Sequence, residues 1–300
     1  MNGLPLVVIT GGSRGIGDRL VQTFVRSVDV LNISRTRAQK RIDSRRELHN
    51  LCLDLSELEC IEQRLTAWCD AHPQYAVVTL IHNAAVLNLG QLDVLKQVSV
   101  ENSFRVNVYA PLAITNAIAG SNHFARDGAR VLYVVSSLGR PSAELSFAGM
   151  GLYSMTKAAL GKLALIQRRE FELTLPSVRV LRIHPGIVDT DLQTELRTAR
   201  SIDPAFEVKT SLVPHYREGD WNDRSPAENM RTISPELAAE FIRWAAESSQ
   251  VSAEEYDFYH CTQFHADRVT VDNGHQVSMI DVEGVQLADP GAGTPRGATG

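Results

Sequence analysis

The sequence has little of what several specialised classes of protein require. No apolar run approaches the roughly 20 residues that a membrane-spanning helix needs. Only three residues precede the first predicted strand, so we expect no signal peptide. The 4 cysteines form no C-x-x-C pair, and the 9 histidines form no ligand set of the H-E-x-x-H kind. We therefore expect a cytoplasmic protein with reduced thiols and without a catalytic metal.

Charge and length narrow the possibilities further. The net charge is −5 and no long run of Lys or Arg occurs, so neither nucleic acid nor a membrane is an expected partner. A basic stretch over residues 35–46 is the one exception. A chain of 300 residues with 44% hydrophobic content is long enough to bury a large core. We expect one α/β domain that acts on a small molecule.

Short β-rich runs alternate with longer helical patterns along most of the chain. The expected strands cover residues 4–9, 30–34, 48–53, 76–81, 131–135, 178–183 and 256–260. The expected helices start near residue 16 and cover about 56–70, 100–119, 153–173 and 234–248. Such alternation predicts a doubly wound, parallel, seven-stranded sheet, with ligands at the carboxyl ends of its strands.

The predicted domain spans residues 1–262. Within it, residues 191–233 are irregular, and a stretch of that length predicts a substrate lid rather than an idle loop. Residues 263–300 are polar, then rich in Gly, Pro and Ala, and predict a disordered tail.

The beginning of the chain has the pattern of a phosphate-binding turn. The apolar run Leu4–Ile9 leads directly into Thr10-Gly-Gly-Ser-Arg-Gly-Ile-Gly17, and an amphipathic helical pattern follows. Unpaired N–H groups and the dipole at a helix N-terminus favour a pyrophosphate, and glycines let the backbone approach it closely. Alone, such a turn is also compatible with a plain loop.

A second group of side chains suggests proton transfer. Tyr153 and Lys157 are four residues apart near the start of a predicted helix, so both project from one face. A nearby ammonium is expected to lower the pKa of the phenol, which could then exchange a proton with a substrate oxygen. Ser136 and Ser137 end the preceding strand, where a hydroxyl could bind a carbonyl oxygen or simply form a turn. Asn107 lies mid-helix, either facing solvent or as a buried amide that holds a water beside Lys157.

Taken together and in order, these motifs resemble those of the short-chain dehydrogenases/reductases over about residues 4–260. They are Thr10–Gly17, Asn83-Ala84, Asn107, Ser137, Tyr153-Ser-Met-Thr-Lys157 and Pro185-Gly186. The resemblance implies a Rossmann fold and a homodimer or homotetramer. It also implies that Tyr153 is the general acid/base, that Ser137 polarises the carbonyl and that Lys157 binds the nicotinamide ribose. Asn107 would anchor a water in a proton relay.

The resemblance also implies a set of residues that bind the cofactor. They are Gly11, Ser13, Arg14, Gly15, Ile16, Gly17, Arg35, Thr36, Asp54, Leu55, Asn83, Ala84, Tyr153, Lys157, Pro185, Gly186, Val188 and Thr190. Two departures from the family pattern stand out. Ala85 follows His82-Asn83-Ala84 where the family commonly has N-N-A-G, which adds a methyl group near the cofactor. Ser137 and Tyr153 are 16 residues apart, a longer spacing than the family pattern, and we expect the surplus at residues 140–150 to reshape the substrate pocket.

The end of the second predicted strand indicates which nicotinamide cofactor is bound. An acidic residue at this point binds the ribose 2′-hydroxyl of NAD, whereas an arginine suits the 2′-phosphate of NADP. This chain reads Ser34-Arg35-Thr36-Arg37, without a carboxylate, and Arg14 lies on the same side. We therefore predict NADP(H). A solvated basic surface is the alternative explanation for these arginines.

Within the family, the chain is most similar in pattern to sepiapterin reductases and benzil (diketone) reductases. The segments that carry this likeness are Val178–Gln193, Ser136–Leu138 and Tyr256–Tyr259. The last one implies that Asp257 binds the substrate, in addition to Ser137 and Tyr153. An ordinary polar residue on the last strand is the alternative explanation for Asp257. The predicted function is an NADPH-dependent carbonyl reductase that acts on a small vicinal dicarbonyl or a pterin side-chain ketone. An alcohol/ketone oxidoreductase of another substrate class and a non-catalytic NADP-binding sensor remain the alternatives.

Overall fold

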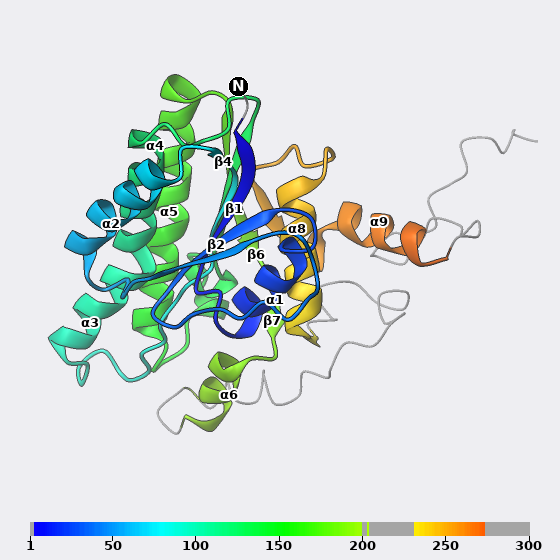
Figure 1. The fold of residues 1–300 in the computed structure, drawn as a ribbon. Helices are drawn as coiled ribbons and strands as arrows, with labels where there is room; N and C mark the ends of the chain where they lie inside the picture. Colours follow the sequence, from blue (N-terminus) through cyan, green and yellow to red (C-terminus); the bar gives the residue numbers. More distant parts are fainter. Residues whose placement is uncertain (1–2, 200–202, 204–230, 274–300) are drawn as a thin grey trace, which may run out of the picture.

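The computed structural model describes residues 3–199, 203 and 231–273, which form a parallel sheet between two layers of helices (Figure 1). Its seven strands are β1 (Leu4–Thr10), β2 (Asp29–Ser34), β3 (Leu48–Cys52), β4 (Tyr75–His82), β5 (Ala129–Val134), β6 (Val178–His184) and β9 (Glu255–Asp257). They lie in the order β3-β2-β1-β4-β5-β6-β9, and every pair of neighbours is parallel. The predicted doubly wound sheet of seven strands is confirmed.

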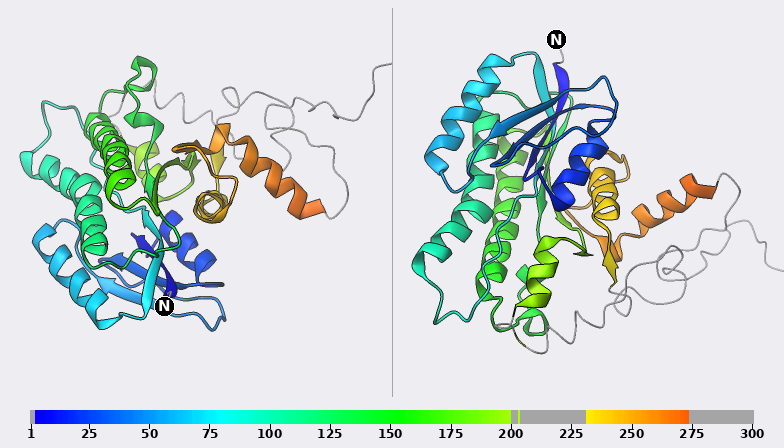
Figure 2. Two further views of the ribbon diagram at one scale, coloured as in Figure 1. Left: turned by 90° about the horizontal axis from the view of Figure 1, so that it is seen from above. Right: turned by 60° about the horizontal axis from the view of Figure 1, so that its bottom comes forward.

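Helices cover both faces of the sheet, as the views in Figure 2 show. On one face lie α1 (Gly15–Phe24) and α8 (Pro235–Glu247); on the other lie α2 (Leu58–Ala71), α4 (Ala110–Gly120) and α5 (Gly151–Thr174). Two further helices are α6 (Asp191–Thr198) and α9 (Thr262–Asn273), and β7 (Ile187–Val188) pairs with β8 (Thr232–Ile233) in a small second sheet. None of the helices in the described ranges is long and apolar enough to cross a membrane.

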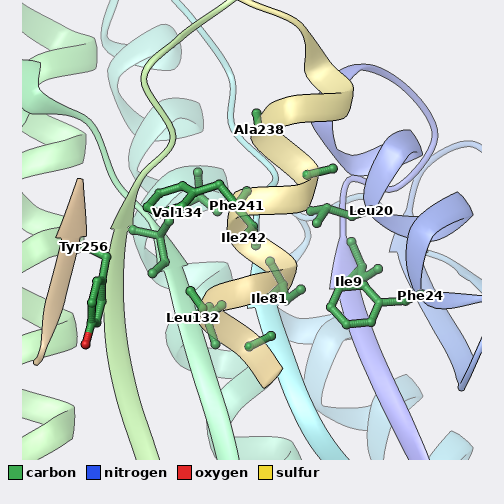
Figure 3. Close-up of a cluster of buried hydrophobic side chains, with 14 of the residues drawn as sticks. Ile9, Leu20, Phe24, Ile81, Leu132, Val134, Ala238, Phe241, Ile242 and Tyr256 are labelled. Carbon is green, nitrogen blue, oxygen red and sulfur yellow. The ribbon is translucent and has the colours of Figure 1, made fainter. Parts of the chain in front are cut away.

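The apolar strands explain the two layers, because successive side chains of a strand point to opposite faces. In β1, Val7 and Ile9 join the core under α1 and α8, whereas Leu6 and Val8 join the core under α2, α4 and α5. Figure 3 shows the first of these cores, where Ile9 lies among side chains of α1, α8 and neighbouring strands. Because both faces of the sheet are packed against helices, the positions of the strands are fixed. The edge at which the strands end is fixed with them.

One predicted helix differs in detail. The helix expected over 100–119 begins earlier, as α3 (Gln97–Phe104), and continues through a π-helical turn (Arg105–Tyr109) into α4. Such turns interrupt the regular hydrogen-bond ladder and often occur at functional sites. Asn107 lies inside this turn.

The predicted disordered tail was wrong in its first part. Residues 263–273 belong to α9, because Phe264 and His265 are buried against the α8 core, with the Phe264 ring 5.1 Å from that of Phe241. Residues 274–300 lie outside the described residues. Of the predicted lid at 191–233, the described parts are α6, β8 and the residues beside them; 200–202 and 204–230 lie outside the description.

Candidate active site

A cavity of about 910 Å³ opens at the carboxyl edge of the large sheet. Residues that follow all seven strands of this sheet line it, among them Gly11, Arg35, Asn83, Ser136 and Pro185. In a doubly wound fold this edge is where ligands bind, because the loops that leave parallel strands meet there.

The glycine turn between β1 and α1 forms one end of the cavity. Gly11 and Gly15 have φ angles of 72° and 55°, a region that L side chains rarely adopt. A Cβ on Gly17 would lie only 2.1 Å from the Gly11 carbonyl oxygen, so this position excludes any side chain. No side chain caps the start of α1 at Arg14, which leaves its first N–H groups for an anionic ligand. The turn thus has the geometry of a pyrophosphate cradle.

The loop after β4 is fixed against this turn. The hydroxyl of Thr10 accepts hydrogen bonds from the N–H groups of Asn83 and Ala84, each at 3.0 Å, and the Asn83 amide donates to the Thr10 carbonyl at 3.1 Å. Ala84 and Ala85 line the cavity. The small side chains at this position therefore border the space beside the glycine turn.

The same cavity is lined by Arg35, Thr36, Asp54 and Leu55, and also by Arg14. The N–H of Ser56 and, to a lesser degree, the Arg35 guanidinium hold the pKa of Asp54 below its usual value. Other members of the basic stretch over 35–46 have structural partners elsewhere, such as Arg41, which forms a two-point ion pair with Asp18.

Tyr153 and Lys157 lie one turn apart on α5 and both reach the cavity. The Lys157 ammonium donates to the Val134 carbonyl at 2.8 Å and lies 5.7 Å from the centre of the Tyr153 ring. Burial lowers the pKa of Lys157 to about 8 and raises the pKa of Tyr153 to about 12. The expected lowering of the phenol's pKa is thus not seen, because desolvation penalises the phenolate. At neutral pH this phenol carries its proton and can donate it.

Ser137 begins a 3₁₀ turn, Ser137–Gly139, that lies directly on α5. A Cβ on Gly139 would come within 2.7 Å of the Ala158 nitrogen and of the Lys157 carbonyl carbon. The Ser136 hydroxyl accepts from the N–H of Leu138, whereas the Ser137 hydroxyl has no hydrogen-bond partner among the described residues. Ser137 is therefore the hydroxyl that is available to a ligand. The close packing of this turn on α5 requires a glycine at position 139, which the sequence motif did not indicate.

Asn107 is a buried residue, and its solvent-facing alternative is excluded. Its Oδ1 accepts from the Val86 N–H at 2.8 Å, and its Nδ2 donates to the Val86 carbonyl and to the Thr156 hydroxyl, each at 3.0 Å. Both amide N–H groups are thus used, and no hydrogen bond reaches Lys157. The Asn107 side chain thus links Val86, in the segment after β4, to Thr156 of α5, the residue before Lys157.

Pro185 and Gly186 lead from β6 along the cavity toward Val188 and Thr190. Gly186 has a φ of 88°, and a Cβ there would contact the Tyr259 ring at 3.2 Å. The Tyr259 hydroxyl accepts from the Ile187 N–H at 2.9 Å and donates to the Arg231 carbonyl. Tyr259, which sequence reasoning did not single out beyond its segment, thus positions this loop from the far edge of the sheet.

The other end of the cavity combines an apolar and a charged wall. Leu138, Phe147, Leu192 and Leu196 contribute the apolar side. Residues of the long 140–150 segment, Phe147 among them, line the cavity, as the spacing suggested. Asp257 also borders it, but Arg140 donates to its Oδ2 at 3.0 Å and the Tyr259 N–H donates to its Oδ1 at 3.1 Å. The predicted substrate carboxylate is therefore already paired.

No group of His, Cys, Asp and Glu side chains in the described part of the chain is arranged to hold a metal ion. The Arg14 guanidinium lies 3.7 Å from Asp191, and both side chains are well exposed, so this ion pair contributes little.

Comparisons with known proteins agree with this architecture. A family model described as short chain dehydrogenase matches residues 5–201. Sepiapterin reductase from Bos taurus is 29% identical over 238 residues, 74% of this chain and 85% of that protein. Benzil reductase ((S)-benzoin forming) from Bacillus cereus is 26% identical over 254 residues, 81% of this chain and 94% of that protein.

Solved structures share the fold at lower identity. The short chain dehydrogenase/reductase YIR035C from Saccharomyces cerevisiae superposes with a TM-score of 0.68 at 19% identity, covering 87% of this chain and 98% of that one. A short chain dehydrogenase from Burkholderia cenocepacia J2315 in complex with NADP gives a TM-score of 0.60 at 21% identity, covering 84% and 94%.

The contact between Gly139 and α5 leads to a first prediction. Gly139→Ala should lower the free energy of unfolding by about 1–3 kcal/mol, because the methyl group meets backbone atoms that cannot move aside. Gly161→Ala is the matched control, since no atom lies within 4 Å of its added Cβ and it lies within α5. That substitution should stabilise by about 0.5–1 kcal/mol. Urea unfolding of the two variants measures both values, and equal effects would contradict the tight packing of the Ser137–Gly139 turn.

Proposed function

The chain belongs to the short chain dehydrogenase family of oxidoreductases, and we propose that it is an NADPH-dependent carbonyl reductase. The observation that supports this most is one cavity that is lined by Ser137, Tyr153 and Lys157 and bounded by the glycine turn. Each group alone has structural explanations, but a proton donor, a cation and an available hydroxyl beside a phosphate cradle together suit reduction of a carbonyl.

The family binds NAD(P), and the residues present fit such a cofactor. The uncapped start of α1 and the side-chain-free glycine turn suit a pyrophosphate, while the buried Lys157 ammonium suits the hydroxyls of a ribose. When bound, the reduced nicotinamide supplies the hydride that is added to the carbonyl carbon.

The protein's own groups act on the carbonyl oxygen. The Tyr153 phenol, which is protonated at neutral pH, donates its proton to this oxygen as the negative charge develops there. The Ser137 hydroxyl donates a hydrogen bond to the same oxygen and so orients the carbonyl. The Lys157 ammonium stabilises the phenolate that remains after proton transfer.

We propose NADPH rather than NADH because cations border the cavity at the end of β2. Arg35 follows β2 and lines the cavity, as Arg14 does, and no carboxylate occurs among residues 34–37, where the chain leaves the strand. A guanidinium matches the geometry of a phosphate with paired donors.

For the substrate we propose a small vicinal dicarbonyl or a pterin side-chain ketone. The names of the two relatives, sepiapterin reductase and benzil reductase, support this class. A wall of Leu138, Phe147 and Leu192 suits the apolar part of such a molecule.

The first test is the substitution Tyr153→Phe. It should lower kcat for benzil reduction by about 100-fold or more, because it removes the proton donor, and should leave the Kd for NADPH within about threefold. The parent enzyme is first screened by NADPH oxidation with benzil, sepiapterin and simple aldehydes. A Tyr153→Phe enzyme that still turns over at the parental rate would show that another group supplies the proton.

Cofactor choice is tested with Arg35→Ala. The parent should use NADPH at least tenfold more efficiently than NADH, and the substitution should remove most of this difference by raising the KM for NADPH, because one charge-assisted contact to phosphate is lost. Arg37→Ala, an exposed arginine outside the cavity, is the matched control. Equal use of both cofactors by the parent would refute the choice of NADPH.

The pH dependence follows from Lys157. Its pKa of about 8 means that the ammonium loses its proton as the pH rises through that value, so kcat/KM for reduction should be constant at neutral pH and fall above about 8. Tyr153, with a pKa of about 12, stays protonated over this range. A profile measured from pH 6 to 10 checks this, and an activity that rises above pH 8 would contradict the assignment.

A further inference from the structure

The long segment between Ser137 and Tyr153 brings an arginine into the substrate end of the cavity. Arg140 lines the cavity, and its N–H donates to the Ser137 carbonyl at 3.0 Å, so its backbone is tied to the turn that presents the Ser137 hydroxyl. The guanidinium therefore belongs to the neighbourhood of the proposed reaction.

Two carboxylates of β9 hold this guanidinium in place. Its Nη2 donates to Glu255 Oε1 and to Asp257 Oδ2, both at 3.0 Å. Glu255 and Asp257 are two residues apart on one strand and thus point to the same side, while the intervening Tyr256 is buried on the other. The register of β9 against β6 places both carboxylates at the carboxyl edge of the sheet, beside Arg182 and His184.

This pairing masks the charge of Asp257. One carboxylate oxygen accepts from Arg140 and the other from the Tyr259 N–H, and the side chain is only 12% exposed. A ligand that offers hydrogen-bond donors would have to displace Arg140 before it could bind this carboxylate.

The guanidinium retains donors of its own. Of its nitrogens, only Nη2 has partners among the described residues, so Nε–H and both N–H groups of Nη1 are available. The Arg140 side chain is 39% exposed at the cavity wall. Glu144, the other charged residue of this segment in the wall, is exposed and forms no ion pair with another described residue, so it does not compete for the remaining donors of Arg140. This end of the cavity therefore presents donors.

We infer that Arg140 is a specificity-determining residue that binds a carboxylate on the carbonyl substrate. By its pairing with Asp257, Arg140 also prevents this carboxylate from binding substrates that offer hydrogen-bond donors. The inference rests on the proposed carbonyl reductase function and selects among its substrates. It favours dicarbonyl compounds that carry a carboxylate over a pterin, whose ring offers N–H donors. A guanidinium held by two carboxylates is already oriented, so little side-chain entropy is lost when it binds.

The test compares benzil with 4-carboxybenzil, which differ by one carboxylate, using NADPH and the full chain. Arg140→Met should lower kcat/KM for 4-carboxybenzil about tenfold or more, mainly through KM, because a charge-assisted hydrogen bond is lost. The same variant should change kcat/KM for benzil less than threefold and should lower the KM for sepiapterin, since Asp257 becomes available. Arg140→Lys should restore part of the preference for 4-carboxybenzil.

Two control variants separate this role from a structural one. Arg169→Met removes an exposed arginine on α5 that pairs with Glu172 and should leave both substrates unaffected. Asp257→Asn should leave the KM for 4-carboxybenzil within about threefold, because the Asn side-chain oxygen can still accept from Arg140 and Glu255 still holds the guanidinium. Equal losses on benzil and 4-carboxybenzil in Arg140→Met, or no loss on either, would overturn the inference.

Failure of the proposed function gives a different result. If the parent reduces neither benzil compound, the reductase proposal fails, and calorimetric titration of 4-carboxybenzil into the protein then decides the inference. Binding about tenfold weaker in Arg140→Met than in the parent supports it, and equal affinity overturns it.

Discussion

The hydrogen bond between the Lys157 ammonium and the Val134 carbonyl is the contact on which the candidate site depends. It joins the first turns of α5 to the end of β5, and so fixes the helix that carries Tyr153 relative to the sheet edge. Burying an ammonium is costly unless it is hydrogen-bonded, which explains why its position is so closely defined. The Ser137–Gly139 turn lies on the same part of α5, so the hydroxyl, phenol and ammonium share one rigid support.

Around this support, each neighbouring element is held by a side chain that does not itself face the reaction. Asn107 ties the segment after β4 to Thr156 on α5. Thr10 ties the loop after β4 to the glycine turn, and Tyr259 ties the loop after β6 to the last strand. Because the loops of a parallel sheet would otherwise be independent of one another, these few long-range hydrogen bonds convert several loops into one site.

Sequence reasoning predicted the sheet and the position of the site because both follow from local pattern. The alternation of buried residues in β1 and the glycines of the following turn are visible within a few residues, and parallel strands necessarily end at one edge. What it missed depends on partners that are distant in sequence. Arg140 binds Asp257, which lies 117 positions further along the chain, and no local sequence pattern predicts that pair. The pKa of Tyr153 was expected to fall because of Lys157, but burial, which only the packed structure defines, has the larger effect. The helical start of the predicted tail likewise arises from packing of Phe264 on Phe241 rather than from its own polar sequence.

The two ends of the cavity are built from different kinds of structural elements. The glycine turn, Lys157 and Tyr153 lie on β1–α1 and α5, elements buried against two cores, and small changes there would disturb the whole fold. The substrate end is instead built from residues 140–150, α6 and the short strand β9, which contribute few side chains to either core. Substitutions in these parts can change the shape and charge of this end of the cavity without moving Tyr153. In this chain, these parts place Arg140 beside the one carboxylate expected to bind substrate, so the charge at this end of the cavity differs from what that carboxylate alone would provide.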